Sequence, residues 1–320
     1  MSSSKKVLVV FGATGNQGGS VVNSILSDPI ASARFHIRGI TRDISKPAAL
    51  ALADKGVETV QADLQEKDSL RKALDNAYAV FAVTNFWEHL DVTLEVQQGK
   101  NIADVAKELN IEHLIWSGLP NVAKISNNKF SKVYHFDGKA EITDYIRTLA
   151  IPHTIVHLGI FTSFPLENLI PTSTSPAKYK LSFPIPNTAS FPLIDVKADT
   201  GKYIKAILLN PSQTLGNTIN LAEDWYTMDQ MITVLKELGL DVVYEEVDDL
   251  AFRRALEARG LPAFIAEDVC QNCMFVNEFG YFGGEGLEVG HQAWIQLVKE
   301  PLTDLKKSVA NSAIFKNLTS

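Results

Sequence analysis

Short runs of apolar residues alternate with longer amphipathic stretches along the first half of the chain. The short runs are rich in β-branched residues, which predicts buried strands. The stretches between them repeat their apolar residues every three to four positions, which predicts helices. Strands that alternate with helices form a parallel sheet covered on both faces, because each crossover is right-handed. The predicted fold class is therefore α/β, a doubly wound parallel sheet with strands at residues 7–11, 35–40, 57–61, 80–83, 111–116 and 154–158.

The pattern changes after Gly159. Residues 160–192 are rich in proline, serine and threonine, which indicates loops around a short extended piece at 179–183. We expect residues 1–158 to form a first domain, to which a segment near 190–210 returns. Residues 159–320 are expected to form a smaller α+β lobe over the carboxyl ends of the strands, as one wall of a cleft. Its predicted helices fall at 197–209, 228–238, 249–259, 263–275 and 302–311, and its short strands at 218–221 and 242–247.

Three glycines join the first predicted strand to the first predicted helix. Gly12, Gly15 and Gly18 stand at three-residue intervals in the stretch GATGNQG. Glycines let the backbone approach a phosphate without a Cβ, and the first N–H groups of a helix stabilise its negative charge. A strand, a glycine turn and a helix are the context in which such a motif binds the pyrophosphate of a dinucleotide. The first half of the chain is accordingly predicted to be a Rossmann domain.

Polar residues follow the next three strands, at the sheet edge where ligands of such folds bind. Arg42 ends the second strand and suits the 2′-phosphate of NADP(H), whereas the acidic Asp43 points to the other side. Asp63, after the third strand, either contacts the adenine or caps the helix that follows. Thr84 and Asn85 follow the fourth strand. The pattern favours NADP(H) as the cofactor, with a solvated Arg42 as the alternative.

Reductases with this kind of sheet usually pair a tyrosine with a lysine one helical turn later, in the spacing YxxxK. Here Tyr134 and Lys139 are five positions apart, which rotates their side chains by about 140°. Lys139 is thus a candidate for binding the cofactor, for catalysis or for the surface. A catalytic proton would have to come from Lys139, His135 or water. His157, near the end of the sixth strand, is a candidate lining residue of the cleft or a core histidine.

The composition of the chain limits the kinds of partner that it is expected to bind. The formal net charge of −7 argues against direct binding to nucleic acid or to an anionic membrane, and no apolar run approaches the roughly 20 residues of a membrane span. The N-terminus lacks the pattern of a signal peptide, so a cytoplasmic or also nuclear location is expected. Cys270 and Cys273 have the CxxC spacing, but no second Cys/His pair accompanies them. We therefore expect core cysteines and no metal site.

Several motifs in order resemble the NmrA-like family of atypical short-chain dehydrogenases. They are GATGNQG (12–18), TRD (41–43), TNFWE (84–88), QQGK (97–100), WSGL (116–119) and HFDGKAEITDYIR (135–147). The resemblance implies a Rossmann domain, NADP(H) as ligand and a smaller C-terminal lobe. It places the pyrophosphate at Gly12, Ala13, Thr14, Gly15, Asn16, Gln17 and Gly18, the 2′-phosphate at Arg42, the adenine at Asp63 and Leu64, the cofactor beside Thr84 and Asn85, and the nicotinamide at Lys139, Gly159 and Phe161.

Members of this family resemble either sensors or reductases. Sensors bind NADP(H) and regulate a protein partner, such as a transcription regulator or a metabolic enzyme, whereas reductases act on a carbonyl or imine of a small molecule. The displaced Tyr134 favours an NADPH/NADP+ sensor. The alternative, a small-molecule substrate pocket, is favoured by the segment 161–192, which includes an apparent insertion before Asn168 and could cover the cleft with Phe164, Phe183 and Phe191. A homodimer that binds the cofactor only as a stabilising ligand is a third possibility.

Overall fold

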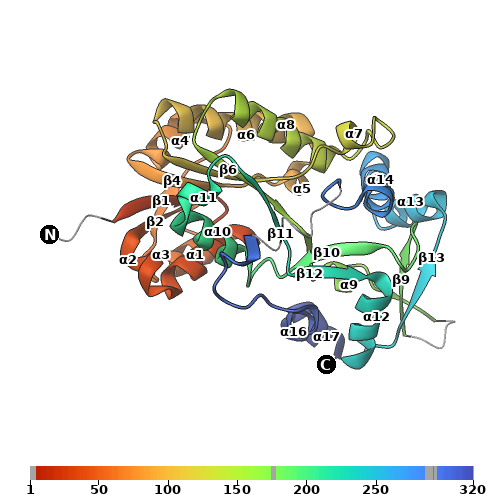
Figure 1. Ribbon diagram of the computed structural model, residues 1–320. Coiled ribbons are helices and arrows are strands. Elements are labelled where there is room, and N and C mark those ends of the chain that lie inside the picture. The colour runs from red at the N-terminus through yellow and green to blue at the C-terminus, as the bar shows by residue number, and fades with distance from the viewer. Residues whose placement is uncertain (1–4, 174–177, 285–290, 292–293, 320) are drawn as a thin grey trace.

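A seven-stranded sheet forms the centre of the first half of the molecule. The computed structural model describes residues 5–173, 178–284, 291 and 294–319 (Figure 1). All neighbouring strands of the large sheet are parallel. The predicted doubly wound Rossmann sheet is thereby confirmed, and the strand order reverses between β1 and β4, which is where such sheets bind ligands. The order is β11 (Thr218–Leu221), β6 (His153–Leu158), β5 (His113–Gly118), β4 (Ala77–Ala82), β1 (Lys6–Val10), β2 (Phe35–Thr41) and β3 (Glu58–Gln61).

Helices cover both faces of this sheet, as Figure 1 shows. Each face has its own buried apolar core, because the helices present an apolar stripe to alternate residues of the strands. One face is covered by α4 (Lys67–Leu74), α6 (Val92–Glu108) and α8 (Tyr134–Thr148), and the other by α1 (Asn16–Ser27), α3 (Pro47–Ala53) and α10 (Thr200–Leu209). Shorter helices follow α1, β4, β5 and α10, namely α2 (Pro29–Arg34), α5 (Phe86–His89), α7 (Val122–Ile125) and α11 (Pro211–Thr214).

The chain returns to the large sheet after leaving it. From the sequence we predicted that residues 218–221 belong to the smaller lobe. These residues instead form β11, which pairs with β6 as the seventh strand of the large sheet, so that prediction is wrong. The preceding helix α10 packs closely on α1, and the N–H of Gly201 donates to Ser20 Oγ at 2.9 Å. A Cβ at position 201 would lie 2.1 Å from the carbonyl oxygen of Ser20. A glycine is needed here because the two helix backbones touch.

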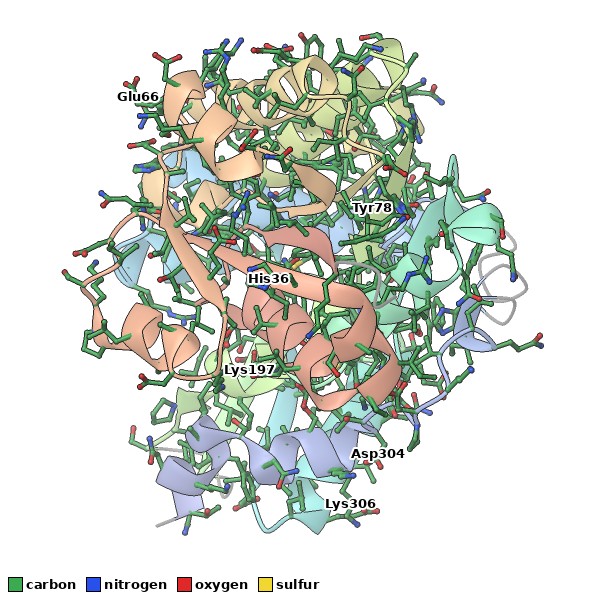
Figure 2. All side chains as sticks on the ribbon, turned by 90° about the vertical axis from the view of Figure 1, so that its left-hand side faces the viewer. His36, Glu66, Tyr78, Lys197, Asp304 and Lys306 are labelled. Atoms are coloured by element: carbon green, nitrogen blue, oxygen red, sulfur yellow. The ribbon has the colours of Figure 1, made fainter. Side chains whose placement is uncertain are left out.

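The rest of the chain forms a smaller α+β lobe with its own core of buried residues. It contains the small sheets β12–β10–β7 and β13–β9–β8. In Figure 2, Asp304 and Lys306 mark its C-terminal helices, at the opposite end of the molecule from Glu66. The strands are β7 (Ile160–Phe161), β8 (Ile170–Pro171), β9 (Tyr179–Phe183), β10 (Ser190–Ile194), β12 (Asp224–Thr227) and β13 (Val242–Glu246). The helices are α9 (Phe164–Glu167), α12 (Met228–Glu237), α13 (Asp249–Ala258), α14 (Ala263–Phe279), α16 (Leu305–Asn311) and α17 (Ala313–Thr319).

Aromatic contacts fix this lobe against the start of α8. The ring of Phe136 meets Tyr281 at a centroid distance of 5.2 Å, and Phe130 meets Phe275 at 6.4 Å, both edge to face. Such pairs stabilise by roughly 0.5–1.5 kcal/mol beyond their buried area. Helix α14 is consequently held beside the first turn of α8, which carries His135.

Candidate cofactor and substrate site

The turn after β1 is shaped to receive a phosphate. Gly12 has a φ of +61°, and Gly15 precedes the first residue of α1. A Cβ on Gly18 would lie 2.3 Å from the carbonyl oxygen of Gly12, so the helix rests directly on the turn. Within the described residues, no side chain caps α1 and its first turn holds no acidic residue. The unpaired N–H groups and the helix dipole therefore suit a pyrophosphate.

A large cavity, of about 1110 Å³, lies over the carboxyl ends of the central strands and against the smaller lobe. Ala13 does not line it: its side chain is buried in the core, 3.0 Å from where Gly39 would carry a Cβ. The side chain of Ala13 is thus a packing group, so its predicted contact with the pyrophosphate rests on its backbone and stays a prediction. The other expected cofactor residues all line the cavity: Gly12, Thr14, Gly15, Asn16, Gln17, Gly18, Arg42, Asp63, Leu64, Thr84, Asn85, Lys139, Gly159 and Phe161.

The loop after β3 is held by side chains around it. Asp63 accepts a hydrogen bond from the N–H of Gln65 at 2.9 Å, which stabilises the turn before α4. The carbonyl of Leu64 accepts from Asn101 Nδ2 at 2.9 Å. Asp63 thus stabilises this turn but does not cap α4, whose N-cap is Glu66 and which has no side-chain cap bond from any described residue. It lines the cavity, and its contact with the adenine stays a prediction.

Lys139 is largely buried in a network rather than on the surface. Its Nζ donates to the carbonyl of Thr84 at 3.0 Å, to Thr84 Oγ1 at 2.9 Å and to Glu95 Oε1 at 2.7 Å. Thr84 Oγ1 in turn donates to Glu95 Oε1 at 2.7 Å. The Glu95 side chain is 2% exposed. All three ammonium protons of Lys139 are therefore engaged.

Sequence reasoning missed Glu95, although one signal was available. Glu95 lies in the first turn of α6 between Val92 and Val96, on the apolar side of the helix. A carboxylate at such a position needs a partner, because an unpaired buried charge is very costly. The structure gives it Lys139, 44 residues further along the chain.

His135 lies one helical turn before Lys139 and lines the same cavity. Its Nδ1 is paired with Asp268 Oδ1, and its backbone N–H donates to Asp268 Oδ2 at 3.1 Å. Trp87 of α5 lies against its ring, with centroids 5.0 Å apart. Tyr134 contacts Phe264 instead, at 6.4 Å. No local pattern pointed to Asp268, because it is 133 residues away from His135.

Arg42 forms an ion pair with Glu88 of α5 at the rim of the cavity. The Arg42 side chain is 65% exposed and that of Glu88 33%. The carboxylate of Asp43 is engaged locally, since it accepts from Ser45 Oγ at 2.6 Å and from the N–H of Ser45 at 2.9 Å. These bonds hold the pKa of Asp43 below its usual value. Arg42 is thus the residue of this strand end whose charge suits a phosphate, and Glu88 holds it at the rim.

Beyond Lys139 the cavity continues between the lobes as a largely apolar chamber, although Glu167, Asn168 and Arg259 also line the cavity. Phe164 and Phe191 line it as expected, whereas Phe183 does not. Phe183 is buried behind Phe164, with ring centroids 5.2 Å apart, and this corrects the prediction. Asn272 also lines the chamber, and its buried Nδ2 has no hydrogen-bond partner among the described residues. Further apolar lining residues from the smaller lobe are Leu256, Leu261, Val269 and Tyr281.

The structure also places the histidine and the two cysteines that were candidates from the sequence. His157 is absent from the cavity lining; it lies opposite Asn220 of β11, and burial lowers its pKa to about 3. Of the two alternatives that the sequence left open for His157, the structure supports the core histidine. Cys270 and Cys273 are buried free thiols, as expected, and burial raises the pKa of Cys270 to about 11. In the described ranges, no three His, Cys, Asp or Glu side chains could hold a metal, and no helix could cross a membrane.

The sheet order and the glycine turn at its switch point define a Rossmann-type dinucleotide-binding protein. The chain belongs to the NmrA-like family, whose family model matches residues 4–311. It is 27% identical over 288 residues to an NmrA-like family protein of Dictyostelium discoideum, covering 87% of this chain and 89% of the relative. It is 29% identical over 310 residues to the oxidoreductase ptmS of Penicillium ochrochloron, covering 90% and 89%.

Solved structures share the fold over nearly the whole chain. The negative transcriptional regulator NmrA in complex with NADP covers 98% of this chain, with 99% of its own chain covered, at 19% identity and a TM-score of 0.73. The triphenylmethane reductase of Citrobacter sp. complexed with NADP(H) covers 95%, with 99% of its own chain covered, at 22% identity and a TM-score of 0.73. One fold therefore serves a regulator and a reductase.

Proposed function

We propose that this protein is an NADPH-dependent reductase of hydrophobic, ring-containing carbonyl or imine compounds. The observation that carries the proposal is the continuity of the cavity from the glycine turn, past Lys139 and His135, into the apolar chamber. A protein that only binds the dinucleotide has no need for such a chamber, whereas small-molecule sites are apolar cavities with a few polar groups. The relative ptmS, covered over most of its length, is also named an oxidoreductase.

The displaced Tyr134 no longer favours a sensor over a reductase. The position one turn before Lys139, which a tyrosine holds in the common YxxxK spacing, is occupied by His135. Histidine is the side chain most often used for general acid and base catalysis. The position one turn before Lys139 therefore still carries a side chain that can donate a proton.

The chain's own residues have distinct roles under this proposal. The turn 12–18 and the N-terminus of α1 would hold the pyrophosphate, Arg42 the 2′-phosphate, and the Lys139 ammonium would lie against the nicotinamide ribose. NADPH, when bound, supplies a hydride. Glu95 and Thr84 keep Lys139 in one orientation, since they accept its three protons. The apolar side chains of the chamber would orient the substrate, with Asn272 Nδ2 as a donor.

The test is an absorbance assay of NADPH oxidation with a panel of aromatic ketones and cyclic imines. We expect turnover of at least one compound, and the same compound should raise the thermal midpoint of the NADP+ complex. Leu256→Arg, which places a charge in the chamber, should remove both effects while NADPH affinity stays within about threefold, because Leu256 belongs to α13 of the smaller lobe whereas the glycine turn joins β1 to α1. Tight NADPH binding with no turnover of any compound would contradict the proposal.

A regulatory role is the second candidate, and the Arg42–Glu88 ion pair favours it. Glu88 belongs to α5, whose Trp87 lies on the His135 ring. A 2′-phosphate on Arg42 would compete with Glu88 for the guanidinium and so act on α5. Binding of NADP(H) would then alter the surface near α5, where a protein partner could respond. Such a response requires different affinities of the two conformations for the cofactor.

Glu88→Gln is expected to tighten the binding of NADPH by up to roughly fivefold, because an exposed ion pair that competes for Arg42 contributes about 0–1 kcal/mol. The affinity for NADH should not change, since NADH has no 2′-phosphate. Calorimetric titration with both cofactors measures the difference. An equal change for NADPH and NADH would show that Glu88 does not compete at the 2′-phosphate.

A further inference from the structure

Asp268 of the smaller lobe contacts His135, the histidine that lies one helical turn before Lys139. Its side chain is fully buried on α14, yet both oxygens are directed at His135 of α8. Oδ1 pairs with ring Nδ1, and Oδ2 accepts the backbone N–H at 3.1 Å. This double contact fixes the ring and leaves Nε2 as its remaining polar atom. His135 lines the cavity, and Nε2 is the ring nitrogen that remains for a ligand there.

We infer that His135 is the proton donor of the reduction and that Asp268 is its positioning residue. The inference rests on the proposed function. Hydride from NADPH reduces the substrate carbon, and the C=O double bond becomes a single bond. The oxygen takes the proton from Nε2 of the His135 imidazolium, which becomes neutral imidazole and later regains a proton from water. The products are an alcohol and NADP+; an imine gives an amine in the same way.

The alternatives to His135 are poorly arranged for this step. Every proton of the Lys139 ammonium has an acceptor within the protein, so it is held as a fixed positive charge. Tyr134 contacts Phe264 away from the cavity. His135 has an oriented carboxylate on one nitrogen, the arrangement that lets a histidine exchange a proton through the other nitrogen.

Other charged groups surround this pair, and they favour the same assignment. On helix α8, Asp137 and Lys139 follow His135 by two and four positions, and α5 brings Glu88 and His89 to the cavity. Asp137 accepts from the N–H of Ala123 at 3.2 Å, and burial raises its pKa. Asp268 is then the carboxylate in direct contact with the ring, and it stabilises the imidazolium.

The decisive variant is Asp268→Asn, which has the same shape. The amide oxygen of the introduced side chain can replace Oδ2 in accepting the His135 backbone N–H, and its NH2 group then faces Nδ1 and donates to it. The neutral ring must consequently hold its proton on Nε2 instead of Nδ1. Glu267→Gln, on the same helix, changes the charge by the same amount but alters contacts with Arg253 and Gln271, not with His135. It is the matched control.

The experiment compares the wild type, Asp268→Asn and Glu267→Gln by nitrogen NMR of the seven histidine rings, by calorimetry with NADPH, and by turnover. The His135 signal is assigned from its loss in His135→Gln. In the cofactor-free wild type we expect the neutral ring to be protonated on Nδ1, and in Asp268→Asn on Nε2. We expect kcat to fall by roughly 10²–10⁴-fold in Asp268→Asn, with little change in Glu267→Gln and with NADPH affinity retained in both.

The outcomes separate this inference from the proposed function. If the wild type reduces a compound and Asp268→Asn moves the ring proton without lowering kcat, His135 is not the donor, although the reductase stands. If the spectra of the wild type and Asp268→Asn agree, Asp268 does not set the ring, and its role is overturned. If the wild type reduces nothing while it binds NADPH, the reductase proposal fails and the donor role fails with it.

Discussion

Replacing Lys139 by methionine is expected to lower the free energy of unfolding by roughly 3–5 kcal/mol, because it leaves the Glu95 carboxylate buried without its cation. The Glu95 side chain is 2% exposed, and its Oε1 receives hydrogen bonds from both Lys139 and Thr84. Methionine keeps most of the volume of the lysine stem, so the change removes charge rather than packing. Urea unfolding of the two proteins at neutral pH measures the difference.

The matched control uses a second pair between the same two helices. Lys100 of α6 bonds to Glu141 of α8 at 2.7 Å, with side chains 30% and 58% exposed. Since exposed pairs contribute little, Lys100→Met should cost less than about 1 kcal/mol. The double variant Lys139→Met/Glu95→Gln should recover most of the loss, because the remaining groups are neutral. Equal costs for Lys139→Met and Lys100→Met would contradict this account of Glu95.

This coupling affects how a loss of function at Lys139 is interpreted. A single Lys139 variant that neither binds NADPH nor turns over substrate is ambiguous, since the loop with Thr84 depends on the same network. The double variant separates the two causes. If it is folded and stable yet has lost NADPH affinity, Lys139 contacts the cofactor. If it retains the affinity, the lysine serves to neutralise Glu95.

Much of the fold follows from the sequence because its signals are local. Apolar strands and 3.6-residue patterns identify the elements of the first half, and the right-handed crossover rule assembles them. The same rule brings the carboxyl ends of β1, β2 and β4 to one edge, so Gly12, Arg42 and Thr84 line one cavity although no pattern links them. A candidate site built from strand ends is therefore predictable from one sequence.

The features that the sequence did not reveal depend on contacts between distant segments. The return of β11 to β6 and the approach of Asp268 to His135 are set by how the second lobe docks. Phe183 was misplaced, and His157 was left with two alternatives, for another reason: a residue near a strand end has two faces available, and only the packed neighbours decide which one meets the cavity. Glu95 is the exception, because a carboxylate on an apolar helix face is visible in the sequence.

Replacing Arg42 by alanine is expected to weaken NADPH binding by about 1.5–3 kcal/mol, or roughly 10- to 150-fold, because a charged hydrogen bond to the 2′-phosphate is lost. NADH lacks that phosphate, so its affinity should change by less than about threefold. The Arg42 side chain lies at the rim and is 65% exposed, so the substitution should leave the fold intact. Parallel calorimetric titrations with NADPH and NADH measure the selectivity.

Glu88 should enlarge this loss of NADPH affinity, because Arg42→Ala leaves the Glu88 carboxylate unpaired beside the expected phosphate. Repulsion then adds to the lost attraction. The double variant Arg42→Ala/Glu88→Gln removes the repulsion, so its NADPH affinity should lie between those of Arg42→Ala and the wild type. Glu88→Gln alone is expected to bind NADPH more tightly than the wild type. The affinity for NADPH should therefore rise from Arg42→Ala through the double variant and the wild type to Glu88→Gln. For NADH, the four proteins should have similar affinities. If all four proteins discriminate NADPH from NADH equally, Arg42 does not recognise the 2′-phosphate, and another residue must select the cofactor.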